Sequence, residues 1–142
     1  MGSVIPLKKE IDNSYIELKN LVGNKLDRVS QQIKYKLASE INLIQKMTSY
    51  HLESGGKRIR PLLTLGSAKL CGYINGSRDI NLAACTELIH NATLLHDDVI
   101  DNSDLRRGIK TSNTIWGNQS SILVGLYFST HNVLFIIYLA IP

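Results

Sequence analysis

Apolar side chains recur every three or four residues along the segment from 25 to about 52, and this spacing places them on one side of an α-helix. The stripe consists of Leu26, Val29, Ile33, Leu37, Ile41, Ile44 and Met47. No segment of the chain sustains the strict alternation of apolar and polar residues that indicates a β-strand. The spacing therefore predicts an all-α protein in which residues 25–52 form one long amphipathic helix.

The remaining elements are predicted from residues that start and stop helices. A shorter helix is expected before this long one, ending at the Gly23-Asn24 pair, which is typical of a helix C-cap. A helix over 61–72 is expected from its leading proline, and another is expected over 80–102. A polar loop is expected to follow as far as about Ser120, after which the sequence becomes strongly apolar.

Composition limits the class of protein. A chain of 142 residues with 44% hydrophobic residues is long enough for one domain with a core, and it is too apolar to be disordered. The two cysteines, Cys71 and Cys85, lack the spacing of a metal site, and their small number suits a reducing compartment. The start of the chain has no apolar segment of the kind found in secretory signals. We therefore expect a cytoplasmic protein.

Positive charge is concentrated in two short clusters. The net charge is +4; one cluster consists of Lys57, Arg58 and Arg60, and the other consists of Arg106, Arg107 and Lys110. Basic clusters can bind nucleic acid, but these two flank the most acidic stretch of the chain, which would repel a phosphate backbone. We therefore do not expect nucleic acid to be a partner.

The acidic stretch lies at the end of the helix predicted over 80–102. On a helical wheel with about 100° per residue, His90, Asp97 and Asp101 share one narrow stripe, and Asp98 lies about 80° away from it. The opposite side of the wheel is apolar and consists of Leu88, Ala92, Leu95 and Val99. Crowded carboxylates repel one another unless a cation lies between them, so a metal site is one interpretation. The alternative is an exposed acidic helix end whose charges are solvated. The spacing alone leaves both open.

The ligand types favour magnesium if this stretch holds a metal. Mg²⁺ prefers oxygen ligands and commonly takes one or two carboxylates together with phosphate oxygens, whereas Zn²⁺ would need nearby cysteines or further histidines. The two basic clusters would add donors for phosphate groups on both sides of the aspartates. Carboxylates that bind magnesium, with cations around them, predict a diphosphate-binding site.

Three motifs occur together in an order that resembles the trans-type polyprenyl diphosphate synthases. GGKRIRP (55–61) is similar to the segment that binds the homoallylic substrate in this family, and LLHDDVIDNSDLRRG (94–108) contains its first aspartate-rich motif, DDxxD. TSNTIWGNQSSILVG (111–125) follows a further family signature. The resemblance covers roughly residues 25–125 and is strongest to long-chain, octaprenyl-type synthases. It implies the N-terminal half of an all-α isoprenoid-synthase bundle.

The resemblance also implies a reaction and roles for individual residues. Members of the family catalyse the Mg²⁺-dependent head-to-tail condensation of isopentenyl diphosphate with an allylic prenyl diphosphate. Asp97 and Asp101 would bind the magnesium that bridges the allylic diphosphate, and Asp98 would support them as a third catalytic carboxylate. Arg106 would hold the allylic diphosphate. The isopentenyl diphosphate would be held by Lys57, Arg60, His90 and Arg107.

Ala92 bears on the product length that the resemblance implies. In this family a bulky residue five positions before the first aspartate tends to stop the growing chain early, and Ala92 occupies that position here. A small residue favours a long product, of the kind used for quinone side chains. Ala92 is also consistent with ordinary packing of a small residue in a helix.

The C-terminal part of the sequence departs from the family pattern. The family uses a second aspartate-rich motif on a later helix, but no Asp or Glu follows Asp104 here. Leu126 stands where an aspartate usually follows the LVG sequence. We therefore divide the chain into an N-terminal helix (1–24), the N-terminal half of a synthase domain (25–125) and an atypical apolar tail (126–142).

This departure leads to the hypothesis that the chain is truncated and is inactive alone. The alternatives are a non-catalytic diphosphate-binding or interaction subunit, which would dock on a partner, and a degraded remnant. The apolar run from Val133 to Ile141 is too short to cross a membrane, so we do not expect the tail to associate with one. Helices without packing partners would expose apolar stripes, so we expect a homo-oligomer or a partner-dependent protein.

Overall fold

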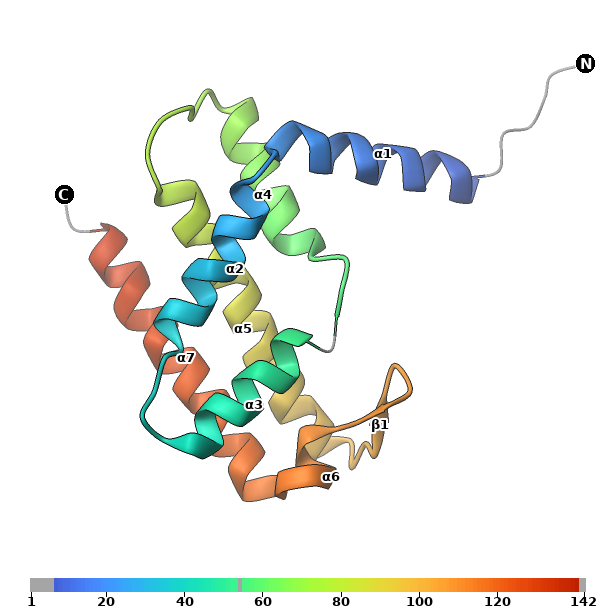
Figure 1. Cartoon of the computed structure of the whole chain (residues 1–142), viewed down its shortest axis with the longest axis vertical. Coiled ribbons are helices and arrows are strands. Elements are labelled where there is room, and N and C mark those ends of the chain that lie inside the picture. The colour runs from blue at the N-terminus through green and yellow to red at the C-terminus, as the bar shows by residue number, and fades with distance from the viewer. Residues whose placement is uncertain (1–6, 54, 141–142) are drawn as a thin grey trace, which may run out of the picture.

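The protein's structure, a computed structural model, describes residues 7–53 and 55–140, with side chains described from 13 to 132 (Figure 1). In these residues it forms seven α-helices and one two-stranded hairpin, which confirms the all-α prediction apart from the hairpin. The elements are α1 (Leu7–Val22), α2 (Lys25–Lys36), α3 (Asn42–Glu53), α4 (Ile59–Leu70), α5 (Arg78–Ile100), β1 (Leu105–Arg106), β2 (Ile109–Lys110), α6 (Ser112–Trp116) and α7 (Asn118–Ala140).

Helix α5 is the centre of the bundle. It packs against α7, α4 and α2, so its apolar residues are covered from three sides (Figure 1). Leu88, Ala92 and Leu95 are buried on the side of α5 that the helical wheel indicates as apolar. Their neighbours in the core include Val29 and Ile33 from α2, Leu62 and Leu65 from α4, and Val124 and Phe128 from α7. This packing fixes α5, which supplies His90 and Asp98, against α4, at whose start Arg60 lies.

The long helix predicted over 25–52 is two helices, and that prediction is therefore wrong at its middle. The helical backbone stops after Lys36 and resumes at Asn42. Ser39 explains the break, because its hydroxyl accepts a hydrogen bond from the Ile41 backbone N–H at 3.2 Å and its carbonyl accepts one from Gln45. A serine that binds nearby backbone groups competes with the helix. Ile41 is consequently exposed instead of lying on the buried stripe.

The segment after α5 is also more ordered than the predicted polar loop. Arg107 and Gly108 both have positive φ angles, of 53° and 80°, which produces a tight two-residue turn between β1 and β2. Helix α6 follows the hairpin, and α7 begins at Asn118. These elements return the chain to the C-terminal end of α5, next to the acidic stretch (Figure 1).

The first and last helices differ in how they contact the rest. Helix α1 packs on α4, where Leu18 lies so close to Gly66 that a Cβ atom on the glycine would be 2.8 Å from it, and α1 then extends away from the bundle (Figure 1). Helix α7 buries Val124 but leaves Leu123 and Leu126 exposed. Among the described residues, no helix combines the length and apolarity needed to cross a membrane. Part of the predicted run from 133 to 141 lies outside the described residues.

Candidate diphosphate site

A cavity of about 610 Å³ opens between α3, the start of α4, α5 and the β1–β2 hairpin. Its volume is in the range of pockets that bind small molecules. The cavity brings together six of the predicted site residues from segments far apart in the sequence: Lys57, Arg60, His90, Asp98, Arg106 and Arg107. Asp97, Asp101 and Ala92 do not line it.

Residues 55–58, which lead into α4, line this cavity and are held in place by other helices. Arg58, the residue before α4, adopts a left-handed conformation with φ of 46°. Its guanidinium donates hydrogen bonds to the Ser30 hydroxyl at 2.9 Å and to the Leu52 carbonyl. The Tyr15 hydroxyl donates to the carbonyl of Lys57, and the Lys57 ammonium lies 5.8 Å from the centre of the Tyr15 ring. The basic segment is therefore held by contacts with α1, α2 and α3.

The β1–β2 turn is connected to the same segment. The Arg107 guanidinium donates a hydrogen bond of 2.8 Å to the Gly55 carbonyl. The approach is close, because a Cβ atom at Gly56 would lie 3.2 Å from Nη1 of Arg107. The two basic clusters, which are separated by about a third of the chain in sequence, thus face one cavity.

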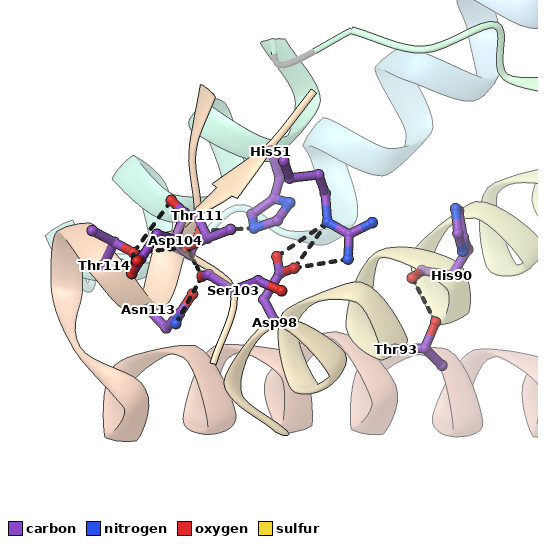
Figure 2. A network of polar contacts seen from close by, with 11 residues as sticks. His51, His90, Thr93, Asp98, Ser103, Asp104, Thr111, Asn113 and Thr114 are labelled. Atoms are coloured by element: carbon purple, nitrogen blue, oxygen red, sulfur yellow. Dashed lines mark hydrogen bonds and ion pairs between the residues drawn. The ribbon is translucent and has the colours of Figure 1, made fainter. Parts of the chain in front are cut away.

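Asp98 and Arg106, which both line the cavity, form a bidentate ion pair. In Figure 2 dashed lines join the labelled Asp98 to this guanidinium. Asp98 is only 2% exposed, and its carboxylate accepts hydrogen bonds from Nε and Nη2 of Arg106 at 3.0 and 2.7 Å. This hydrogen bonding raises the pKa of Arg106, so the guanidinium keeps its charge. In the described part of the chain, Nη1 of Arg106 has no hydrogen-bond partner. Asp98 therefore positions Arg106 instead of offering a free carboxylate.

Asp97 and Asp101 lie outside the cavity on the exposed side of α5. They are one helical turn apart, with the Asp101 backbone N–H donating to the Asp97 carbonyl at 2.8 Å. Neither carboxylate has a hydrogen-bond or ion-pair partner within the residues that the structure describes. That same part of the chain contains no group of three or more His, Cys, Asp or Glu side chains placed to hold a metal ion. Two unpaired carboxylates fit Mg²⁺, which takes its other ligands from water and phosphate, better than they fit Zn²⁺.

His90 and Ala92 have different surroundings although they are two residues apart. His90 is half-buried and faces the cavity, where burial lowers its pKa and Arg60, Arg106 and Arg107 lower it further. Its imidazole is therefore neutral at pH 7 and can donate a hydrogen bond to an anion through a ring N–H. Ala92 is buried in the core against the neighbouring helices. Both positions follow from the different faces of α5 on which they lie.

Sequence reasoning missed several groups that line or support the cavity. His51 lies against Ser112, with 2.8 Å between Nε2 and Oγ, and burial lowers the pKa of this histidine (Figure 2). The Tyr50 hydroxyl donates to the Lys110 carbonyl, and Glu87 lines the cavity from α5. The sequence carries no local signal for Tyr50 and His51, because each meets the site through tertiary contacts across long separations. Glu87 lies one helical turn before His90, so the spacing along α5 could have indicated it.

Comparison with known proteins identifies the family. The model of the polyprenyl synthetase family matches residues 41–138, which is more than half of the chain. The chain belongs to the polyprenyl synthetase family. The octaprenyl diphosphate synthase of Haemophilus influenzae is 42% identical to this chain over 124 residues, which cover 87% of the chain and 37% of the relative.

Solved structures show the same relationship for the fold. A decaprenyl diphosphate synthase from Rhodobacter capsulatus aligns with a TM-score of 0.81 at 39% identity, covering 87% of this chain and 38% of its own. A polyprenyl synthase from Caulobacter crescentus, solved with calcium and isoprenyl diphosphate, aligns with a TM-score of 0.82 at 35% identity over 87% and 38% of the two chains. This chain therefore spans less than half of the length of the relatives described above.

Proposed function

We propose that this chain supplies the diphosphate-binding part of a polyprenyl diphosphate synthase. The reaction would join isopentenyl diphosphate head-to-tail to an allylic prenyl diphosphate. The observation that carries the proposal is the convergence of four cationic or donor side chains from three segments on one cavity: Lys57, Arg60, His90 and Arg107. The lining also includes apolar side chains suited to a short hydrocarbon group: Leu52, Ile59, Leu94 and Ile109.

The cavity side of α5 would hold isopentenyl diphosphate, and its C-terminal end would hold the allylic diphosphate. Arg106, fixed by Asp98, would present its remaining N–H donors to the allylic phosphate oxygens. Asp97 and Asp101 would hold Mg²⁺ there, because they are the exposed, unpaired carboxylates beside Arg106 in the described structure. When bound, Mg²⁺ would neutralise negative charge on the departing diphosphate.

The residues of the chain would act mainly by orientation and electrostatics. As the allylic C–O bond breaks, Arg106 would stabilise the negative charge that develops on the leaving diphosphate. The double bond of isopentenyl diphosphate, held by Arg60 and Arg107, would attack the allylic cation, and loss of a proton would complete the new double bond. No Asp or Glu follows Asp104, so we expect binding without turnover when this chain is assayed alone.

Product length and assembly are finer parts of the proposal. A small residue at the Ala92 position favours a long-chain product, and the relative from Haemophilus influenzae is named for an octaprenyl product. The exposed Leu123 and Leu126 on α7 would be covered in a homo-oligomer or by a partner. The composition supports a cytoplasmic location. The exposed side of α7 also favours the second candidate, a non-catalytic subunit that binds diphosphate and docks on a partner.

Calorimetric titration of the chain with isopentenyl diphosphate tests the site directly. We expect Arg60→Ala to weaken binding by about tenfold or more, because it removes a charge-assisted hydrogen bond to phosphate. Arg28→Ala is the matched control, since Arg28 is exposed on α2 outside the cavity. Equal affinities of the two variants would refute the assignment of the cavity.

A second titration and an assay separate the two candidate functions. Mg²⁺ should strengthen the binding of an allylic diphosphate, and Asp97→Asn together with Asp101→Asn should abolish that gain. Labelled isopentenyl diphosphate then reports turnover by the chain alone. Incorporation into a prenyl product by the chain alone would exclude the non-catalytic subunit. Product that forms only after the C-terminal half of a related synthase is added would support the synthase part, whereas binding without product even after that addition would favour the non-catalytic subunit.

A further inference from the structure

Glu87 is a carboxylate inside the cationic cavity that the proposed reaction does not use. It lies on α5 one helical turn before His90, and both side chains line the cavity. Glu87 is half-buried. In the part of the chain that the structure describes, it has neither a hydrogen bond nor an ion pair closer than 4 Å. A carboxylate that loses water without gaining a direct partner is costly to keep ionised.

Three arginines act electrostatically on Glu87 from across the cavity. Arg58 and Arg60 approach from the start of α4, and Arg107 approaches from the β1–β2 turn. Arg58 and Arg107 are held by Ser30, Leu52 and Gly55, so they are positioned without Glu87. Burial raises the pKa of Glu87, and this effect exceeds the opposite effect of the three arginines. The carboxylate therefore holds a proton more readily than an exposed glutamate does.

We infer that Glu87 is the anion that balances the arginines while the cavity is empty, and that diphosphate binding is coupled to the uptake of a proton by Glu87. The inference rests on the proposed function, because it requires a diphosphate in this cavity. A diphosphate brings negative charge to the same arginines, so it replaces the carboxylate as their counter-charge. An ionised Glu87 then repels the ligand, and protonation removes that repulsion.

The sign of the pH dependence follows from this coupling. The complex binds more protons than the empty chain, so the affinity for diphosphate falls as the pH rises through the range in which Glu87 ionises. Glu87→Gln removes the ionisable group while keeping nearly the same shape. We expect this variant to bind diphosphate about tenfold more tightly at pH 8, which corresponds to a change of about one pKa unit on binding.

Other groups in the cavity also respond to an anion, so the test must be a comparison. Apart from Glu87 and the three arginines, the lining groups that can carry charge are Lys57 and Lys110, the imidazoles of His51 and His90, the Tyr50 phenol and the Asp98–Arg106 pair. Diphosphate itself also titrates. These contributions are shared by the unsubstituted chain and the Glu87→Gln variant, so their difference isolates Glu87.

The experiment is a calorimetric titration with inorganic diphosphate and EDTA, from pH 6 to 8.5, in buffers with different ionisation enthalpies. The buffer comparison counts protons taken up on binding. We expect the unsubstituted chain to take up more protons than Glu87→Gln within the ionisation range of Glu87, and its affinity to depend more steeply on pH. Glu40→Gln is the control, because Glu40 is exposed and lies outside the cavity. It should match the unsubstituted chain.

Failure of the inference and failure of the diphosphate site give different results. Equal proton counts and equal affinities for the unsubstituted chain and Glu87→Gln would overturn the role of Glu87 and leave the diphosphate site intact. Absence of diphosphate binding by both would overturn the site and the inference together. If Glu87→Gln does not fold, the carboxyl ¹³C resonance of Glu87 in the unsubstituted chain decides the question. It should move toward the protonated form when diphosphate is added, and an unchanged resonance would overturn the inference.

Discussion

Asp98 and its neighbours Asp97 and Asp101 belong to one five-residue motif, yet their surroundings are opposite. Asp98 is buried and bound through two nitrogens of Arg106, whereas Asp97 and Asp101 are exposed and have no side-chain partners in the described structure. A buried ion pair loses the solvation of both charges and needs a defined geometry to offset that loss, whereas an exposed carboxylate stays available to a ligand. The difference teaches that one acidic motif can contain a carboxylate that positions a neighbouring arginine and carboxylates that stay free to bind a ligand.

Removing Asp98 should have the largest effect. Asp98→Ala leaves the Arg106 guanidinium without its counter-charge, and breaking a fully buried pair of this kind typically costs 3–5 kcal/mol. Because the Arg106 side chain is 39% exposed, water compensates in part, and we expect a loss of about 2 kcal/mol in the free energy of unfolding. Urea denaturation followed by circular dichroism measures it.

The matched variants are Asp97→Ala and Asp101→Ala. Both carboxylates are exposed, so we expect the free energy of unfolding to stay within experimental error of the unsubstituted chain. If all three substitutions destabilise equally, the contrast between the buried and exposed aspartates is wrong.

Gly125→Ala should have an intermediate effect, and it should act near the exposed Asp97 and not near the buried Asp98. The new Cβ would lie 2.3 Å from Nε2 of His96, so the imidazole must move and lose its 3.2 Å hydrogen bond with the Ile122 carbonyl. We expect a loss of about 1–2 kcal/mol. His96 is next to Asp97, so the Mg²⁺-dependent part of diphosphate binding should weaken as well.

A double-mutant cycle checks the cause of that loss. His96→Ala removes the ring, so adding Gly125→Ala to this background should cost much less than it does alone. Additive effects of the two substitutions would show that the helix contact, and not the imidazole, limits the space at Gly125.

The pH dependence of stability should give the smallest effect, and it concerns His51, which lies near the buried Asp98–Arg106 pair. Burial lowers the pKa of His51, and Arg106 lowers it further while Asp98 opposes the change. The folded state then binds fewer protons than the unfolded state below about pH 6.5, so this contribution to stability is lost as the pH falls from 6.5 through the folded pKa. As the pH is lowered from 7.5 to 5, the urea midpoint of the unsubstituted chain should fall more steeply than that of His51→Gln. Parallel slopes would contradict this prediction.

Helix positions could be predicted from local sequence, whereas their interruptions could not. The spacing of Leu88, Ala92 and Leu95 correctly indicates the buried face of α5, because that face depends on periodicity alone. The break at Ser39 depends on one side chain that binds its own backbone, and this competes with a periodic pattern that continues through it.

The site was predictable where residue type decides and unpredictable where packing decides. Lys57 and Arg106 stand out in the sequence as members of two basic clusters, and the structure places both at one cavity. The helical wheel places Asp98 nearer the apolar face than Asp97, but nothing in the sequence indicates that Arg106 pairs with it. That pairing depends on the segment 101–104 and on β1, which bring Arg106 back against the C-terminal end of α5.

The hydrogen bond between Arg107 and the Gly55 carbonyl changes how any substitution at this arginine must be interpreted. The guanidinium connects the β1–β2 turn to Gly55, so shortening the side chain removes both a positive charge and the hydrogen bond between these two segments. Lysine at this position would keep the charge but could not reproduce the planar fork of donors. If Arg107→Ala and Arg107→Lys both lose affinity for diphosphate, the loss reflects the shape of the cavity entrance. If Arg107→Lys keeps the affinity that Arg107→Ala loses, the loss reflects the positive charge.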